Sequence, residues 1–200
     1  MSKVDDNKKQ KKDTLLRAAF DLFTEQGITK TSISEIVGKA GVAKGTFYLY
    51  FKDKYDLKNK LITHKADQIF SNATVALNEQ EIDSVEDKIL FIVDHIIDQL
   101  TMNKSLLSFI SKNLSWGVFK SAITSTSGKD ALNFYEIYEQ MLVDSSHEYR
   151  DPEILLFLIV ELVGSSCHDS ILYNEPAPIS TVKPHILSAV RSILESHVIS

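Results

Sequence analysis

Lysine, threonine and tyrosine side chains that could contact a nucleic acid are gathered in one short stretch in the first third of the chain. Lys44 can reach a phosphate or a guanine edge, and Thr46 can meet a thymine methyl, a base edge or a phosphate. Tyr48 and Tyr50 are amphipathic, so their rings can pack on the protein while their hydroxyls reach phosphate. Gly45 leaves room for a close backbone approach. These residue types predict a nucleic-acid contact surface.

A further lysine, Lys54, falls in the first turn of a helix that we expect to begin at Asp53. The helix macrodipole disfavours a cation there, so this placement is best explained by a phosphate bound at the helix N-terminus. The alternative interpretation is a small helical subdomain with solvated lysines and packed tyrosines. That alternative explains the apolar positions, but not the lysine and tyrosine groups on one face beside a basic N-terminus.

Two short helices joined by a tight turn are needed to position these side chains. Ser32 and Glu35 form a capping box at the start of the first helix, and Gly41 lies at the turn. This is a helix-turn-helix pattern, in which the second helix enters the major groove with its N-terminal residues facing the base edges. Apolar residues of the two helices can form a small shared core: Ile33, Ile36, Val37, Val42, Phe47 and Phe51.

The stretch from residue 13 to residue 62 resembles the DNA-binding domain of the TetR family of bacterial transcription regulators. The matching features are Gly27, the Thr31-Ser32-Ile33 entry, Gly41-Val42 and the Gly-Thr-Phe-Tyr…Tyr-Phe-Lys-Asp-Lys run at 45–54. The resemblance covers about a quarter of the chain. It implies DNA contacts from Ser32, Lys44, Gly45, Thr46, Tyr48, Tyr50 and Lys54.

One position departs from the family pattern. Ala43 stands where such proteins often place a serine that caps the recognition helix. Loss of that cap costs roughly 0.5–2 kcal/mol and removes one phosphate contact.

The composition is that of a globular protein, with 44% hydrophobic and 24% charged residues among 200. The net charge of −5 combines +5 over residues 1–60 with −10 over residues 61–200, so we expect only the basic part to meet a polyanion. A solubilising lysine tail would give the same excess. The longest apolar run, residues 154–160, is too short to span a bilayer, and no secretory h-region follows the N-terminus. We therefore expect a cytoplasmic protein without a membrane partner.

Apolar residues recur with the helical period, and strand signals are nearly absent, so the predicted fold class is all-α. We expect a mobile basic arm (1–12), a helix-turn-helix DNA-binding domain (13–56) and a larger effector-binding and dimerisation domain (57–200). The helix starting at Asp53 joins the two domains, and residues 121–128 form the clearest loop. About nine helices are expected, near residues 13–26, 32–40, 44–50, 53–70, 84–100, 104–114, 130–146, 152–173 and 182–198.

The last two helices are the predicted dimer interface. The first of them is apolar nearly all round from Ile154 to Val163, and small residues follow that allow close helix approach. TetR-like proteins dimerise through such a pair, and a palindrome-reading protein needs two recognition helices. The alternative is a monomeric core. The residues expected at the interface are Ile159, Val163, Ile186, Val190, Ile193 and Leu194.

The resemblance also implies an effector pocket between the middle helices. Aromatic residues are frequent there, although for any single one of them ordinary core packing is the favoured interpretation. The candidate lining residues are His95, Trp116, Phe134, Tyr138, Met141 and His168.

The small number of positively charged residues in the C-terminal part predicts the chemistry of the effector. Residues 61–200 hold only nine lysines and arginines, and burial of a ligand anion without a cationic partner is costly. We therefore expect a small apolar or amphipathic effector with a neutral or positive group. Glu161 is the candidate inward-facing charge, either for a ligand cation or for a helix cap across the dimer. His95 and His168 could still accept a carboxylate if protonated.

The sequence contains no clear catalytic or metal-binding motif. Cys167, His168 and Asp169 are adjacent, so their side chains leave a helix about 100° apart and cannot form a triad. The six histidines show no i, i+4 ligand pair. We expect no catalytic residue, metal or cofactor, and Cys167 is either a buried hydrophobe or a redox-sensing thiol.

The predicted function is a dimeric transcriptional repressor that binds a palindromic double-stranded operator at the bacterial nucleoid and is released by a small effector. Two alternatives remain open. The first is an architectural or cell-division DNA-binding protein on the same fold without an effector. The second is a helical enzyme or carrier whose helix-turn-helix is incidental.

Overall fold

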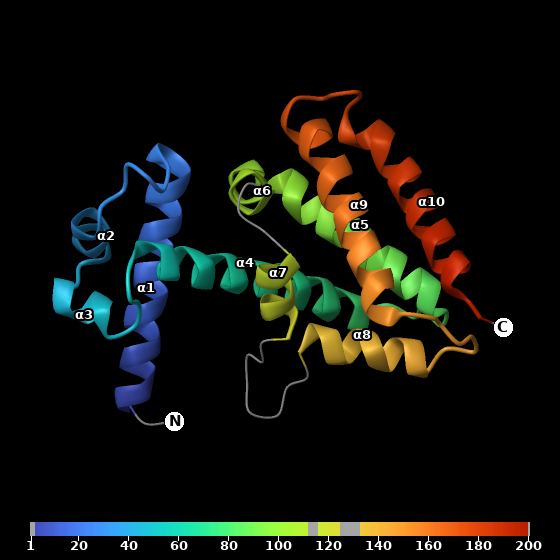
Figure 1. The fold of residues 1–200 in the computed structure, drawn as a ribbon, viewed down its shortest axis with the longest axis horizontal. Coiled ribbons are helices and arrows are strands. Elements are labelled where there is room, and N and C mark those ends of the chain that lie inside the picture. The colour runs from blue at the N-terminus through green and yellow to red at the C-terminus, as the bar shows by residue number, and fades with distance from the viewer. Residues whose placement is uncertain (1–2, 112–115, 125–132, 200) are drawn as a thin grey trace. The chain divides into compact units, whose positions relative to one another are not determined.

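The structure is a computed structural model of the chain, and it describes residues 3–111, 116–124 and 133–199. Across these ranges every regular element is an α-helix, with one isolated antiparallel bridge between Tyr149 and Val198 (Figure 1). The all-α prediction is confirmed. The described residues contain ten helices where about nine were expected.

The chain divides into two compact units, residues 1–64 and 65–200. The boundary falls inside one continuous helix, α4 (Lys54–Asn78). The expected division at residues 56 and 57 therefore lies eight residues too early, and the joining helix is longer than expected.

The N-terminal unit contains α1 (Lys3–Gln26), α2 (Ile33–Ala40), α3 (Lys44–Tyr48) and the first turns of α4. The apolar positions expected in the helix-turn-helix core are buried or half-buried. The largest fully buried side chains of this unit are Leu15, Ile36, Phe47, Phe51, Leu57, Leu61 and Ile62.

The first helix is longer than the sequence predicts. Residues 3–12 were expected to be a mobile arm, but α1 begins at Lys3. Once the packed turns around Leu15 and Leu16 have formed, each further residue adds one hydrogen bond, and lysine and glutamine are good helix formers. Residues 7–12 extend the helix with exposed side chains, so the absence of an apolar face did not end it.

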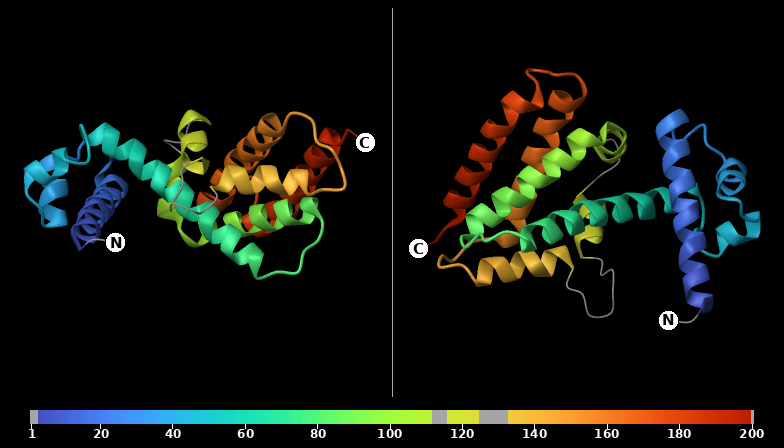
Figure 2. Two further views of the ribbon diagram at one scale, coloured as in Figure 1. Left: turned by 90° about the horizontal axis from the view of Figure 1, so that it is seen from below. Right: turned by 180° about the vertical axis from the view of Figure 1, so that it is seen from behind.

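The C-terminal unit contains the rest of α4 and six further helices. In both views of Figure 2, α9 lies beside α10, and α9 also packs on α5 and α6. α9 is long and apolar enough to cross a membrane, but its seven buried residues pack inside this bundle. The six helices are α5 (Val85–Met102), α6 (Lys104–Ser111), α7 (Trp116–Ile123), α8 (Phe134–Val143), α9 (Pro152–Leu172) and α10 (Ile179–His197).

Four boundaries in this unit differ from expectation. Residues 121–123, predicted as loop, form the last turn of α7, because Phe119, Ala122 and Ile123 are buried at helical spacing. α8 begins after Asn133 and ends at Val143, three residues short of its predicted end, and α10 begins three residues early. The predicted helix residues 112–114 and 130–132 and the predicted loop residues 125–128 lie outside the described residues.

Candidate functional site

The start of α2 is fixed by polar contacts. The Ser32 hydroxyl accepts a hydrogen bond from the Glu35 backbone N–H at 3.2 Å, and the Glu35 carboxylate accepts one from the Ser32 N–H at 2.7 Å. Gln26 Nε2 donates to the same carboxylate at 3.2 Å. The Ser32 side chain and backbone and then Gln26 hold the pKa of Glu35 below its ordinary value. The predicted capping box is confirmed.

The turn between α2 and α3 depends on Gly41. Its φ of 66° lies in the left-handed region, which residues with a Cβ rarely adopt. Its N–H bonds to the Gly38 carbonyl at 3.2 Å, and the Val42 N–H bonds to the Val37 carbonyl at 3.1 Å. α2 therefore ends sharply, and α3 starts three residues later at Lys44.

The short helix α3 presents the predicted contact residues on its outside. Phe47 is fully buried and anchors the helix, whereas Lys44 and Gly45 are exposed and Tyr48 is 53% exposed. Thr46 and the following Tyr50 are half-buried, and the capping residue Ser32 is exposed.

Sequence reasoning missed one residue at this surface. Leu49, directly after α3, is 79% exposed although it is apolar. It is therefore available for an apolar contact with a sugar or a thymine methyl. A five-residue helix is too short for helical periodicity to indicate which apolar residue faces outward.

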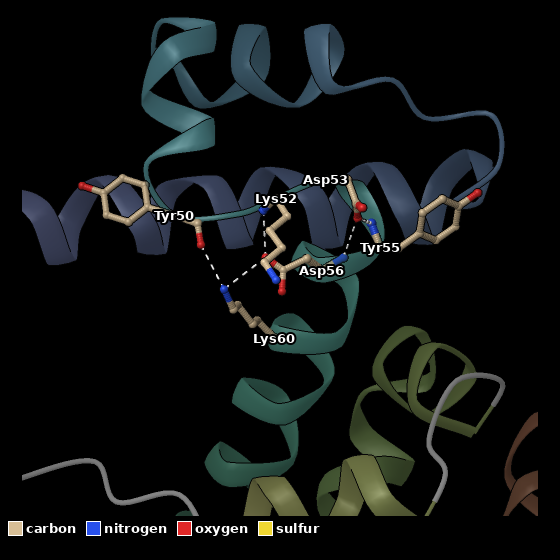
Figure 3. Close-up of polar contacts among 6 residues, drawn as sticks. All are labelled: Tyr50, Lys52, Asp53, Tyr55, Asp56 and Lys60. Carbon is tan, nitrogen blue, oxygen red and sulfur yellow. Dashed lines mark hydrogen bonds and ion pairs between the residues drawn. The ribbon is translucent and has the colours of Figure 1, made fainter.

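The junction between α3 and α4 is held by Asp53, Asp56 and Lys60 (Figure 3). Asp53 accepts hydrogen bonds from the N–H groups of Tyr55 and Asp56, each at 2.8 Å, and so caps α4 as expected. Lys60 Nζ donates to the Tyr50 carbonyl at 3.0 Å and to Asp56 at 3.1 Å. The Lys52 N–H and the Lys60 ammonium lower the pKa of Asp56 against the opposing effect of its burial. Tyr50 is thereby positioned through its backbone.

Lys54 has a different role from the one predicted. Its ammonium donates hydrogen bonds to the carbonyls of Ile28, Thr29 and Thr31 at 2.9, 3.1 and 3.0 Å. An ammonium has three donors, so all of them are used inside the unit. The structure therefore corrects the expected phosphate contact: Lys54 fastens the turn between α1 and α2 to the start of α4.

A cavity of about 560 Å³ lies within the C-terminal unit. Aliphatic and aromatic side chains from α4 to α9 form most of its wall. His95 lies elsewhere, because it occupies the neighbouring face of α5, where its ring stacks on Phe91. The other five predicted lining residues do line the cavity: Trp116, Phe134, Tyr138, Met141 and His168.

Ring contacts hold the aromatic part of the wall. The Trp116 ring stacks on Phe119 with centroids 5.2 Å apart, and Phe70 lies 4.3 Å from Phe134. Tyr138 is 2% exposed and donates its hydroxyl to the Pro152 carbonyl at 2.9 Å. Burial raises the pKa of Tyr138 far above its ordinary value, so it stays neutral.

The described residues offer few features of a catalytic or redox centre. No group of three or more potential metal ligands occurs among the described residues. Cys167 is fully buried, and burial raises the pKa of its thiol to about 11. A thiol with that pKa is almost entirely protonated at neutral pH and is a poor redox sensor.

The helix-turn-helix unit matches a family of known proteins. The family model described as "Bacterial regulatory proteins, tetR family" matches residues 15–61. The uncharacterized HTH-type transcriptional regulator YvdT of Bacillus subtilis is 49% identical over 63 residues, which cover 30% of this chain and 32% of that protein. The N-terminal unit is therefore a helix-turn-helix DNA-binding domain of the TetR type, and the chain spans about a third of the length of YvdT.

Longer matches extend the TetR likeness over most of the chain. The fatty acid metabolism regulator protein of B. subtilis is 27% identical, with 63% of this chain and 75% of that protein covered. FadR from B. subtilis in complex with stearoyl-CoA superposes with a TM-score of 0.66 at 17% identity, covering 90% of this chain and 97% of that one. A putative TetR regulator from Shewanella sp. PV-4 superposes with a TM-score of 0.67 at 19% identity, covering 95% and 99%. These structural matches support the whole TetR fold.

The predicted dimer residues need correction. Five of the six are buried inside the single chain, where α9 and α10 pack on each other and on α5, and the sixth, Ile193, is half-buried. A helical stripe indicates burial but not which partner covers it. The five buried residues are Ile159, Val163, Ile186, Val190 and Leu194.

Proposed function

We propose that this chain is a TetR-family regulator that represses transcription by binding a palindromic operator as a homodimer, and that a small molecule in the cavity releases it. One observation supports this proposal most: an exposed α3 surface and a cavity of about 560 Å³ occur in two units joined by the continuous helix α4. An architectural protein or an enzyme requires no such pairing. The match to the TetR family further supports a cytoplasmic protein that acts at the nucleoid.

The DNA contacts follow from the exposed groups of the N-terminal unit. Lys44 binds phosphate or a guanine edge, Gly45 allows close approach, and Thr46 meets a base edge. The hydroxyls of Tyr48, Tyr50 and Ser32 bind phosphates. One recognition helix per subunit reads a half-site, with the two half-sites about 34–36 Å apart.

Effector release requires a ligand that binds one conformation of the regulator more tightly than the other. α4 contributes Ala66, Ile69 and Phe70 to the cavity wall, and its first residue, Lys54, fastens the α1–α2 turn. A shift of α4 on ligand binding therefore reaches the helix-turn-helix through a covalently continuous element. FadR with stearoyl-CoA supports a small amphipathic effector, and the transcriptional repressor BepR of Brucella suis supports repression.

The dimer contact is assigned to the exposed side of residues 152–158 of α9, where Ile154 and Leu158 lie outside the cavity wall, and to the outer side of α10. Ile154 is 53% exposed and Leu158 is 38% exposed, so α9 has an apolar outer side that remains uncovered within one chain. Ser188 and Ser192 on the outer side of α10 are small enough for close helix approach. Exposed apolar area of this kind marks an association surface.

Selection of bound sequences from random DNA tests the operator assignment, followed by salt-dependent binding of a Lys44→Ala variant. We expect weaker binding and a salt slope reduced by about 1, because one phosphate contact is lost. Lys104→Ala removes an exposed lysine of the C-terminal unit and should leave the slope unchanged. Recovery of no preferred sequence, or equal slopes for both variants, would contradict the assignment.

Sedimentation of a Leu158→Glu variant tests the dimer face. We expect monomers, since a carboxylate would be buried without a partner. Met102→Glu places the same group on a residue 89% exposed at the end of α5 and should remain dimeric. A dimeric Leu158→Glu protein would remove this face from the proposal.

A further inference from the structure

The cavity has one polar side, contributed by α9. Glu161, Ser165, His168 and Asp169 all line the cavity, and their spacing of four, three and one places them on neighbouring turns of that helix. The remaining wall is mainly aliphatic and aromatic. An effector that fills the cavity therefore meets an apolar enclosure and one side with two carboxylates.

The two carboxylates differ in how they are compensated. Asp169 lies 2.6 Å from His168 Nδ1, so it already has a hydrogen-bond partner. Glu161 is exposed and has no hydrogen bond or ion pair with any other residue that the structure describes. Its negative charge is therefore available to a ligand.

No lysine or arginine occurs among the described residues that line the cavity. Two lysines elsewhere in this unit are engaged. Lys183 lies 2.7 Å from both Asp94 and Asp98, and Lys120 lies 2.6 Å from Glu153. An anionic group placed at the polar side would face two carboxylates, and the imidazole there, His168, already contacts Asp169, so among the described residues no free cationic partner offsets the cost.

We propose that the cavity takes an amphiphile with a cationic head, which lies against Glu161 and Asp169 while the apolar body lies between the aromatic walls. This inference rests on the effector role proposed above and names the charge of the effector. A volume of about 560 Å³ is within the range of small-molecule sites. The C-terminal half of α9 carries the negative end of the helix dipole, which also favours a cation.

The contrast with the stearoyl-CoA complex of FadR makes this inference specific. That ligand carries phosphates, whereas the described wall of this cavity offers carboxylates. The Trp116 ring belongs to the cavity wall and adds aromatic surface that a quaternary ammonium can contact.

Calorimetric titration with three ten-carbon ligands below their micelle concentrations tests the charge preference. The ligands are decyltrimethylammonium, 1-decanol and decanoate, which share the apolar body and differ in the head. We expect the cation to bind at least about tenfold more tightly than the carboxylate, with the alcohol between them, because the apolar chains are the same and the two ionic heads have opposite charges. Decanoate or stearoyl-CoA binding as tightly as the cation would overturn the proposal.

Two matched variants locate the charge. Glu161→Gln keeps the shape of the side chain. It should weaken binding of the cation about three- to fivefold, as expected for a partly exposed ion pair, and should leave binding of 1-decanol unchanged. Glu195→Gln makes the same charge change on an exposed residue of α10 outside the cavity wall. It should change the binding affinity of neither ligand. Equal effects of the two variants on the cation would also overturn the proposal.

A blocking variant separates this inference from the effector role itself. Gly164 lines the cavity, and a Cβ there meets nothing within 4 Å, so Gly164→Leu adds a side chain without a backbone clash. It should abolish binding of 1-decanol. If 1-decanol fails to bind the unmodified protein, or binds Gly164→Leu equally well, the effector role fails and the inference with it. If 1-decanol behaves as expected but the cation has no advantage, only the inference fails.

Discussion

The N-terminal and C-terminal units are stabilised in different ways. Between α1 and α4, the N-terminal unit adds several polar contacts to its small apolar core: the Ser32–Glu35 box, the Lys54 ammonium on three carbonyls and the Lys60 bridge to Tyr50. The C-terminal unit relies on apolar packing between segments far apart in the chain and leaves a cavity inside. A surface that reads DNA needs fixed geometry, whereas a ligand site needs space, and the two units meet these needs separately.

The largest expected effect tests the packing of the C-terminal unit. Val190 is fully buried, so Val190→Asp places an unpaired carboxylate in the core and should cost at least about 3 kcal/mol of unfolding free energy. Thermal unfolding followed by circular dichroism measures it. Met102→Asp, which places the same group on a residue 89% exposed at the end of α5, is the control. A folded but monomeric Val190→Asp protein would restore the original interface prediction.

The next effect tests the polar contacts of the N-terminal unit. Lys54→Met removes three hydrogen bonds to turn carbonyls and should lower the unfolding free energy by about 1–3 kcal/mol. Urea unfolding measures it, with the exposed Lys52→Met as the control. The salt slope of DNA binding should not change. If Lys54→Met leaves the unfolding free energy unaltered but reduces the salt slope of DNA binding, Lys54 contacts phosphate as first predicted.

Replacement of a glycine by alanine should change stability in opposite directions in the two units. Gly41→Ala forces a Cβ into a left-handed conformation and should destabilise by about 1–2 kcal/mol. Gly164→Ala lies inside α9 with open space around the new Cβ and should stabilise by about 0.5–1 kcal/mol. Chemical denaturation of both variants measures the difference, and equal signs would show that the two glycines do not differ as described.

The smallest effect is a dependence on pH. Hydrogen bonds lower the pKa values of Glu35 and Asp56, so these carboxylates stabilise the N-terminal unit while ionised. The contribution is complete above the ordinary pKa values and is lost as the pH falls below about 4. Glu35→Gln with Asp56→Asn should be less stable at pH 7 and lose less stability on acidification. Parallel stability curves would remove these two groups as the cause.

The local features of the fold could be predicted from the sequence because their causes are local. The caps at Ser32 and Asp53 and the glycine at residue 41 each require only a few neighbouring residues, and all are present in the structure. α7 was missed because serine and threonine at its end are typical of a loop, while its buried face, Phe119, Ala122 and Ile123, depends on other helices.

Features that depend on distant segments could be predicted only in part. Aromatic residues between α7 and α9 indicated the cavity wall, but His95 shares a helix with that wall and points elsewhere. Val190 and Leu194 form an apolar stripe, yet the stripe does not reveal that the same chain covers it. Lys54 illustrates the same limit, since its three acceptors lie more than 20 residues away.

The position of Trp116 has an optical consequence. It is the single tryptophan of the chain, it belongs to the cavity wall, and its ring stacks on Phe119. Its emission spectrum therefore reports on the surroundings of the cavity, with no background from a second indole. When an apolar ligand displaces water from the cavity, the emission maximum should shift to shorter wavelength. The N-terminal unit contains no tryptophan, so DNA binding there should not quench the emission. The regulator thus carries a built-in, label-free readout that separates its two binding events.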